Sequence, residues 1–145
     1  KELLEDSKFY KLRFIEWIKT NPVPINSKIS YLTNSREMAI CCNKKGKSTF
    51  NSKYDNGIYT YPIYQGARGI DRIHPTQKSL PLFEELIKKH TNENDLVLDC
   101  FMGSGTTALA CVESNRNFIG FEINSDYIEL SKNRIKNKVE QNKLF

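Results

Sequence analysis

A strand–turn–helix–strand pattern in the second half of the chain constrains the fold more than any other feature. The apolar run DLVLDC (residues 95–100) predicts a buried strand, and Gly103 with Gly105 predicts a tight turn directly after it. A helix is expected at about residues 106–114 and a second strand at NFIGFEI (residues 117–123). Strand, helix and strand in succession indicate a βαβ unit with parallel strands, which places the chain in the α/β class.

Two further helices are expected beside this unit. Ser79 can cap the first, with Pro81 in its first turn. One face of that helix is apolar and consists of Leu80, Phe83, Leu86 and Ile87. The second helix spans residues 126–138 and is basic and amphipathic. Its inward side is expected to carry Ile128, Ser131 and Ile135. The basic residues of this end of the chain are expected to form a solvated face: Lys132, Arg134, Lys136, Lys138 and Lys143.

The first half of the chain favours strands. Residues 9–20 (FYKLRFIEWIKT) are rich in aromatic and β-branched side chains, residues 36–43 (REMAICCN) form a short apolar run, and Trp17 is expected in the core. Residues 44–73 then turn polar and tyrosine-rich, and this stretch is expected to be the least regular part of the chain and the best candidate for a loop that carries specificity. Basic and aromatic residues interleave in this segment: Lys44, Lys45, Lys47, Lys53, Tyr54, Tyr59, Tyr61, Tyr64, Arg68 and Arg72. Such a pattern fits a DNA-recognition loop and a tyrosine-rich structural loop equally well.

Composition limits the class of protein. A chain of 145 residues with 39% hydrophobic and 11% aromatic residues can build one domain with a core. Residues 1–90 carry 16 Lys and Arg against 9 Asp and Glu, whereas residues 91–145 carry 6 against 8. This asymmetry fits a polyanion-facing surface joined to a small-molecule site, although ordinary solvated side chains would give the same balance. The four cysteines form no CxxC pair, which favours a reducing, intracellular compartment and no metal site. No run approaches the roughly 20 apolar residues of a membrane span.

The turn sequence DCFMGSGTT (residues 99–107) indicates a ligand site. Gly103 and Gly105 would let the backbone approach a ligand, and the N–H groups at the following helix start suit a carboxylate, a ribose hydroxyl or a phosphate. Glu122 ends the next predicted strand and could accept hydrogen bonds from the hydroxyls of an adenosine ribose. A P-loop is excluded because GK[ST] is missing, whereas Ala108 at the third position is compatible with a dinucleotide fingerprint. Local geometry therefore leaves NAD and S-adenosylmethionine both open.

The order HPTQKS (residues 74–79), helix, DCFMGSGTT resembles the permuted, or beta-class, amino-methyltransferases of DNA. Ser79 stands where that family more often has proline. Upstream, residues 20–24 and 34–40 are similar to the family's stretch between catalytic strand and recognition loop. The resemblance implies a Rossmann-like methyltransferase sheet, incomplete at its N-terminal end, and methyl transfer from S-adenosyl-L-methionine to adenine N6 or cytosine N4. In the family, the His-Pro-Thr-Gln-Lys segment packs beside the methionine moiety and FxGxG binds the cofactor's amino-acid end.

Carried over to this chain, the resemblance implies one methyltransferase domain over residues 1–145. Residues 1–43 would be the remainder of the catalytic half, 44–73 the candidate DNA-recognition loop, and 74–145 the cofactor-binding half. The expected cofactor-binding residues are His74, Thr76, Lys78, Asp99, Phe101, Gly103, Ser104, Gly105, Thr106 and Glu122. Thr76 and Lys78 would hold the carboxylate end. DNA is the expected partner and the cytoplasm the expected location.

The family's catalytic tetrapeptide, [Asp/Asn/Ser]-Pro-Pro-[Tyr/Phe/Trp], is missing from the sequence. None of the five prolines is adjacent to another, and Asn21-Pro22-Val23-Pro24 only echoes the pattern. No catalytic residue is therefore assigned; in the permuted order the tetrapeptide would lie before Lys1, or a complementing polypeptide or homodimer would be needed. Three alternatives stay open: a split or decayed methyltransferase, an NAD-dependent oxidoreductase, and a DNA-binding module with a vestigial pocket.

Overall fold

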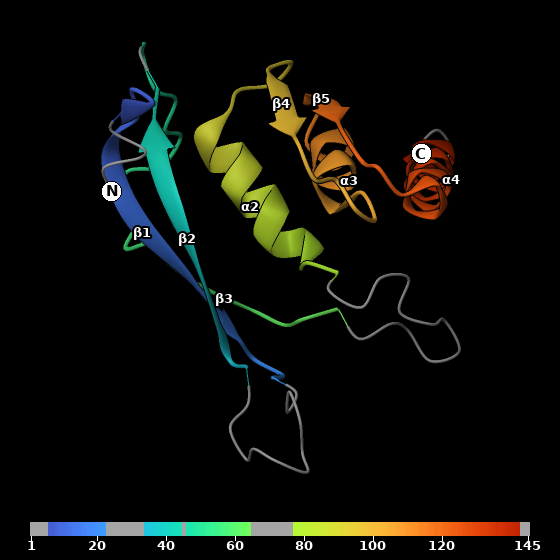
Figure 1. Cartoon of the computed structure of the whole chain (residues 1–145), viewed down its shortest axis with the longest axis horizontal. Helices are drawn as coiled ribbons and strands as arrows, with labels where there is room; N and C mark the ends of the chain where they lie inside the picture. Colours follow the sequence, from blue (N-terminus) through green and yellow to red (C-terminus); the bar gives the residue numbers. More distant parts are fainter. Residues whose placement is uncertain (1–5, 23–33, 45, 65–76, 143–145) are drawn as a thin grey trace. The chain divides into compact units, whose positions relative to one another are not determined.

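The computed structural model describes residues 6–22, 34–44, 46–64 and 77–142 (Figure 1). Within these ranges the chain forms two compact units, Lys1–Ile63 and Tyr64–Phe145. Each unit contains its own small sheet. The α/β class predicted from the sequence is confirmed, with one mixed sheet in the first unit and one parallel pair in the second.

The first unit is a three-stranded sheet in the order β2-β1-β3. Strand β1 (Tyr10–Lys19) runs antiparallel to β2 (Arg36–Asn43) and parallel to β3 (Ile58–Tyr61). The first two strands lie where the sequence predicts them. Trp17 is buried, as expected, and its indole N–H donates to the carbonyl of Tyr61 on β3. That bond fixes the short third strand against the long first one.

Strand β3 lies within residues 44–73, the stretch expected to be the least regular, and the sequence did not predict it. Gly57 explains how a strand begins there. Its φ is 75°, and a Cβ at this position would lie 2.9 Å from the carbonyl oxygen of Phe14. The same tight approach lets the N–H of Glu16 donate to the carbonyl of Gly57 at 2.7 Å. The turn chemistry is local, but the pairing partner lies about forty residues upstream, so the sequence pattern alone does not reveal it.

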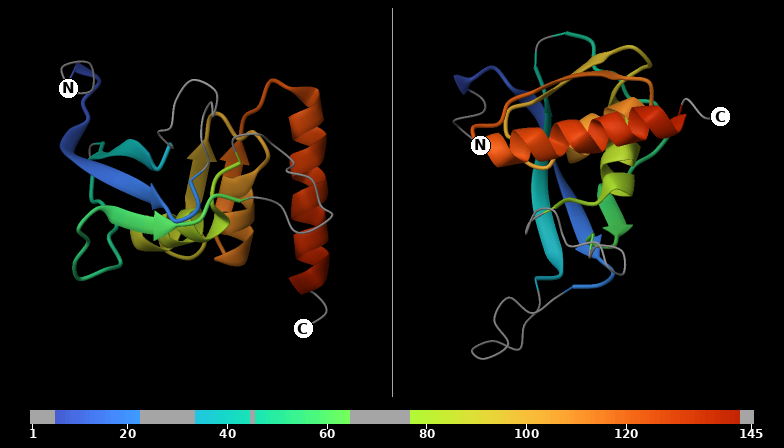
Figure 2. Two further views of the ribbon diagram at one scale, coloured as in Figure 1. Left: turned by 90° about the horizontal axis from the view of Figure 1, so that it is seen from below. Right: turned by 90° about the vertical axis from the view of Figure 1, so that its right-hand side faces the viewer.

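The second unit contains the predicted βαβ arrangement. Helix α2 (Leu80–His90) precedes β4 (Leu96–Asp99), α3 (Thr106–Glu113), β5 (Asn117–Gly120) and α4 (Ser125–Asn142). Strands β4 and β5 are parallel, with Leu96 opposite Asn117 and Asp99 opposite Gly120. Helix α4 is longer than expected, and it packs against α3 (Figure 2). Strand β5 is shorter than expected, so Glu122 lies just beyond its end.

The core of the second unit lies between α2, α3 and one face of the strand pair. Its buried residues are Ile87, Ala110 and Cys111, and Leu80, Phe83, Val97 and Phe118 pack against them. Leu82 is also buried, although it lies outside the apolar face predicted for α2. Ser79 occupies the N-cap position of α2 and Pro81 its first turn, as predicted, but the Ser79 side chain makes no capping hydrogen bond.

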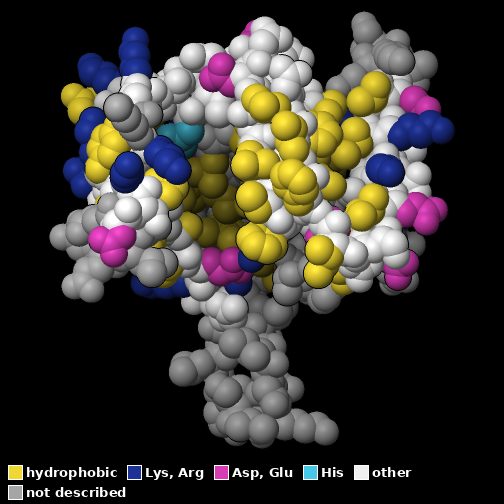
Figure 3. Space-filling model, turned by 45° about the horizontal axis from the view of Figure 1, so that its top comes forward, with side chains coloured by type: hydrophobic (Ala, Val, Ile, Leu, Met, Phe, Trp, Pro, Cys, Tyr) yellow, Lys and Arg dark blue, Asp and Glu magenta, His cyan; other side chains and the backbone are white. Residues whose placement is uncertain are grey.

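Strand β4 is not buried on both faces, which corrects the prediction from its continuous apolar run. Leu96 and Leu98 are 61% and 59% exposed, whereas Val97 packs on the core. The same alternation continues in the neighbouring strand: Ile119 within β5 and Phe121 just after it are both exposed. Figure 3 shows hydrophobic side chains gathered on the surface of the molecule. Within the described part of this unit, Val97 and Phe118 face the helices, and the opposite face of the strand pair carries the exposed apolar side chains.

None of the helices in the described ranges is both long and apolar enough to cross a membrane.

Candidate functional site

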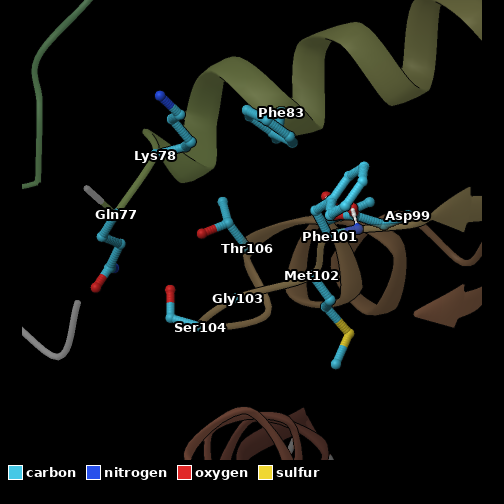
Figure 4. A pocket seen from close by; sticks show the side chains of 10 residues that line it. Gln77, Lys78, Phe83, Asp99, Phe101, Met102, Gly103, Ser104 and Thr106 are labelled. Carbon is cyan, nitrogen blue, oxygen red and sulfur yellow. Dashed lines mark hydrogen bonds between the residues drawn. The ribbon is translucent and has the colours of Figure 1, made fainter. Parts of the chain in front are cut away.

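A cavity of about 250 Å³ opens where β4 ends and α3 begins (Figure 4). One wall comes from the segment that leads into α2, and the other from the turn after β4 and the first turn of α3. The lining residues are Gln77, Lys78, Phe83, Asp99, Phe101, Met102, Gly103, Ser104, Thr106 and Thr107. Six of the ten residues that the sequence assigned to a cofactor site therefore line one cavity: Lys78, Asp99, Phe101, Gly103, Ser104 and Thr106.

Asp99 holds the two ends of the turn together. Its Oδ1 accepts a hydrogen bond from the Phe101 N–H at 3.0 Å, and its Oδ2 accepts one from the Thr107 hydroxyl at 2.5 Å. The carboxylate at the strand end thus ties the start of α3 to the end of β4. Thr107 was absent from the predicted site residues, and the hydroxyl eight residues after the strand-end carboxylate was the available signal.

Gly103 and Glu122 join the turn to the segment after β5. Gly103 has a φ of 52°, and its N–H donates to Glu122 Oε2 at 2.8 Å. Oε1 of the same carboxylate accepts from the N–H groups of Ile123 and Asn124, both at 2.9 Å. Glu122 does not line the cavity itself, but it is bonded to a residue that does. A ribose held by Glu122 would therefore lie next to the glycine turn.

Gly105 serves packing against α4. Its φ is 81°, and a Cβ there would lie 2.8 Å from the Cβ of Ser131, which is fully buried. The sequence interpretation assigned this glycine to close approach by a ligand, but its missing side chain faces a helix of the protein. Gly105 also occupies the N-cap position of α3, so the same residue sets the direction of the helix start.

Arg134 contradicts the expected solvated face of α4. Its guanidinium donates to the carbonyl of Ser104 in the turn. Burial lowers the pKa of Arg134, and the nearby Tyr64 opposes that shift. Together with Ser131, Arg134 makes α4 a support for the turn. The sequence gave no local signal for this role, because the contact depends on how α4 packs.

The start of α3 offers hydrogen-bond donors to the cavity. Thr106 and Thr107 are its first two residues, so their backbone N–H groups have no acceptor within the helix. The aligned peptide dipoles add partial positive charge at this end. Lys78 lies on the facing wall (Figure 4). An anionic group in the cavity would meet positive potential from two sides.

The remaining lining residues define the rims. Phe101 is 92% exposed, and Met102 packs over Gly120, where an added Cβ would clash with the Met102 sulfur. Gln77 is 8% exposed, and its Oε1 has no hydrogen-bond partner among the described residues. His74 and Thr76, both expected at this site, lie outside the described residues.

The described cysteines do not form a metal centre. No group of three or more His, Cys, Asp or Glu residues within the described ranges could hold a metal ion. Cys111 is enclosed in the core, and burial raises its pKa to about 11. Burial and the neighbouring Cys42 raise the pKa of Cys41 as well. Cys100 is exposed next to the turn.

In the first unit, two tyrosines of the tyrosine-rich segment have different surroundings. Tyr54 is 82% exposed, and the ammonium of Lys53 lies 5.7 Å from its ring centre. Tyr59 is buried and its hydroxyl donates to Asp55 at 2.5 Å. Tyr54 therefore offers a stacking surface and Tyr59 is structural. Arg68 and Arg72 lie outside the described residues.

Asn21 is also structural. Its side-chain amide donates to the carbonyl of Ile63 at 3.1 Å, and its Oδ1 accepts from the N–H of Ile63 at 2.7 Å. Both polar ends of the side chain are thus used to extend the pairing of β1 with the segment after β3.

Comparison with known proteins adds an independent line of argument. A family model described as DNA methylase, for N6 and N4 methyltransferases, matches residues 1–133. The chain is 38% identical over 144 residues to the type II methyltransferase M2.MboI of Moraxella bovis, covering 92% of this chain and 52% of that protein. It is 31% identical over 150 residues to M.HinfI of Haemophilus influenzae, covering 92% and 42%. The chain thus spans about half the length of these curated relatives.

Solved structures agree with the sequence matches. The crystal structure of M1.HpyAVI in complex with SAM superposes with a TM-score of 0.76 and 41% identity, covering 92% of this chain and 66% of that chain. The cytosine-N4-specific PvuII DNA methyltransferase superposes with a TM-score of 0.70 at 18% identity, covering 97% and 60%, and supports the fold alone.

Proposed function

The chain belongs to the DNA methylase family of N6 and N4 methyltransferases, and from that premise we propose that its cavity binds S-adenosyl-L-methionine for methyl transfer to DNA. The acceptor would be an exocyclic amine, adenine N6 or cytosine N4. The observation that carries the proposal is the turn after β4, where a carboxylate-braced glycine loop and a helix start line one cavity with Lys78.

The cavity fits the amino-acid end of the cofactor. At about 250 Å³ it is smaller than the roughly 300–1,000 Å³ of pockets that enclose a whole drug-sized ligand. The backbone N–H groups of Thr106 and Thr107, with Lys78, would receive the carboxylate. The adenosine would extend past Gly103 toward Glu122, which would accept the ribose hydroxyl hydrogens. His74 and Thr76 would complete the methionine end.

The contribution of these residues to the reaction is orientation. The bound cofactor supplies a methyl group on a positively charged sulfur, which a nitrogen lone pair can attack. Asp99 keeps the turn and the helix start in register, and Arg134 braces the turn from behind through the Ser104 carbonyl. Holding the cofactor's methyl group in a fixed direction lowers the activation barrier of methyl transfer, because the entropy cost of alignment is then met on binding and not in the reaction step.

Turnover needs a catalytic tetrapeptide from outside the 145 residues, because the sequence contains no adjacent prolines. We place it in a polypeptide stretch that completes the fold, either joined to this chain or supplied by a partner. The open apolar face of the β4–β5 pair supports this, since such a face is normally covered in an α/β sheet. DNA would contact the basic first unit, with Tyr54 as a stacking surface, and bacterial DNA would place the protein in the cytoplasm.

The second candidate function is a module that binds cofactor and DNA without turnover. The missing tetrapeptide favours it. Family membership favours both candidates over a nicotinamide-dependent oxidoreductase.

Calorimetric titration separates these functions. The chain should bind S-adenosylmethionine and should give no heat with NAD; the reverse result would overturn the proposal. Transfer of a labelled methyl group to DNA is then measured with the chain alone and with a polypeptide carrying the tetrapeptide. The enzyme proposal expects label only in the second mixture. Cofactor binding without label in either mixture would favour the binding module.

A further inference from the structure

Basic residues gather at one end of the first sheet, where β1 begins and β2 ends. Tyr10 pairs with Asn43, the last residue of β2, so the segments around these two residues lie side by side. Figure 3 shows several Lys and Arg side chains close together on the first unit. Five exposed cationic residues belong to these segments and are called the basic patch here: Lys8, Lys11, Arg13, Lys44 and Lys47.

Local contacts hold the two segments of the basic patch together. The hydroxyl of Tyr10 donates to the carbonyl of Gly46 at 3.2 Å. The ammonium of Lys44 lies 5.2 Å from the ring centre of Phe9. Both contacts join the segment after β2 to the start of β1, so the cations of the two segments share one surface.

A β-bulge places one of these cations. The pairing of β1 with β2 shifts its register between Tyr10 and Arg13, so Lys11 lies in an irregular part of the strand. The φ of Lys11 is 56°, in the left-handed region that is unfavourable for a residue with a Cβ. Bulges and strained residues of this kind are found preferentially at functional positions.

The positive charge of the basic patch is not neutralised by the described part of the chain. None of the five side chains forms an ion pair with a residue that the structure describes. Asp6 is the only acidic residue among the described residues 6–13, 43, 44, 46 and 47. Five cations so close together create a positive potential that attracts a polyanion.

The position of the basic patch in its sheet fits an anchoring contact. Strands β1 and β3 are parallel, and the patch lies at the amino end of β1. Ligands of α/β sheets bind outside the carboxyl ends of the parallel strands. A reaction site built on these two strands would therefore lie at the opposite edge of the first sheet, and the patch would hold a partner without reacting with it.

The spacing of the cations fits the backbone of DNA. Residues 8–13 extend over at most roughly 17 Å, at about 3.3 Å per residue. One DNA strand presents a phosphate every 3.4 Å or so along the helix axis, so the basic patch can meet about four or five phosphates. Membership of the DNA methylase family favours DNA over other polyanions.

We propose that the basic patch binds the phosphate backbone of duplex DNA and anchors the duplex without reading its bases. The inference takes DNA as the partner from the proposed function. The basic patch shares no residue with the cofactor cavity, so the inference and the cofactor assignment can fail separately.

The test compares two double variants that remove the same charge. Lys11→Gln/Lys47→Gln changes the basic patch, and Lys132→Gln/Lys136→Gln changes exposed positions of α4. Fluorescence anisotropy gives the affinity for two duplexes of unrelated sequence at several salt concentrations. The slope of log affinity against log salt falls in magnitude by about 0.9 for each phosphate contact that is lost.

The patch variant should lose about 1.8 of that slope and bind both duplexes roughly 10- to 100-fold more weakly at 0.1 M salt. The α4 variant should keep the slope of the unchanged chain. An unchanged slope in the patch variant, or an equal loss in both variants, would overturn the inference. Unequal weakening of the two duplexes would also overturn it, because it would indicate base reading.

Vesicles of phosphatidylserine and phosphatidylcholine separate DNA from a membrane surface. If the patch variant loses vesicle binding and keeps DNA binding, the patch is a membrane contact and the inference is wrong. The melting temperature of the patch variant should be unchanged. If it is lower, Lys47→Gln alone replaces the double variant and should lose about 0.9 of the slope, and an unchanged slope there would overturn the inference.

Calorimetry with S-adenosylmethionine tells the two failures apart. The patch variant should bind the cofactor as the unchanged chain does. Cofactor binding without any DNA binding by the unchanged chain would overturn the inference and leave the cofactor assignment standing. DNA binding with the expected loss of slope, but without cofactor binding, would overturn the cofactor assignment and support the basic patch.

Discussion

Replacing Gly105 by alanine tests the packing of the turn against α4. The added Cβ would lie 2.8 Å from the Cβ of Ser131 and 3.5 Å from its Cα. Overpacking of this kind costs typically about 1–3 kcal/mol, because α4 or the turn must shift. The φ of 81° adds roughly 1–2 kcal/mol for a residue with a Cβ. We expect a total loss of stability of about 2–5 kcal/mol.

A double-mutant cycle isolates the steric part of that loss. Ser131→Gly removes the contacting Cβ, at a cost of roughly 0.5–1 kcal/mol for glycine within a helix. In Gly105→Ala/Ser131→Gly the clash is relieved while the backbone strain remains, so the double variant should be at least about 1 kcal/mol more stable than the sum of the single effects predicts. Gly46→Ala is the control: its φ is 127° and a Cβ there meets nothing within 4 Å. It should show no coupling to Ser131→Gly.

The assay is urea unfolding followed by circular dichroism, with the four stabilities measured at one pH. Losses that add to within about 0.5 kcal/mol would show that Gly105 and Ser131 do not constrain each other, and the support of the turn by α4 would be refuted. A loss below about 1 kcal/mol for Gly105→Ala would refute the close approach itself.

Three further predictions concern other parts of the chain. Arg134→Leu should destabilise the protein by roughly 1–3 kcal/mol and weaken binding of S-adenosylmethionine, because the Ser104 carbonyl loses its hydrogen-bond donor. Lys136→Leu, on the exposed side of α4, should change neither stability nor binding. Urea unfolding measures the stability of the two variants and calorimetry measures their affinity for the cofactor. Because burial raises the folded-state pKa of Cys111 from 9.0 to about 11, its contribution to stability is complete below pH 9 and is lost between pH 9 and about 11. Unfolding at pH 8.5 and 11 should show an extra loss of up to roughly 2–3 kcal/mol relative to Cys111→Ala, and identical pH profiles would contradict it. Tyr54→Ala should weaken DNA binding by about 1–3 kcal/mol in a fluorescence titration, with an unchanged melting temperature, because its exposed ring packs on little of the protein.

The sequence predicted the parts of the fold that depend on local patterns. Strands β1, β2, β4 and β5 and helices α2 to α4 lie close to their expected positions, because periodicity and turn residues are local signals. The glycine turn was predicted from the sequence DCFMGSGTT (residues 99–107), which supplies five of the six predicted residues that line the cavity; the sixth, Lys78, lies in the segment before α2. The family resemblance was confirmed by the comparisons.

The parts that the sequence did not predict depend on long-range packing. Strand β3 is four residues long and is specified by pairing with β1, which no local pattern records. The same limit applies to Arg134 and Ser131, whose roles follow from the direction in which α4 crosses the turn. An apolar run such as β4 shows that side chains avoid water, but it does not show which face of the strand is covered.

The most direct test of the central claim is a titration of the ¹⁵N-labelled chain with S-adenosylhomocysteine, followed through its backbone amide resonances. Binding in the cavity predicts the largest shifts at Lys78, at Phe101 to Thr107 and at Glu122, with little change in β1 and β2. An unchanged spectrum at saturating ligand, or shifts centred on the first unit, would contradict the account.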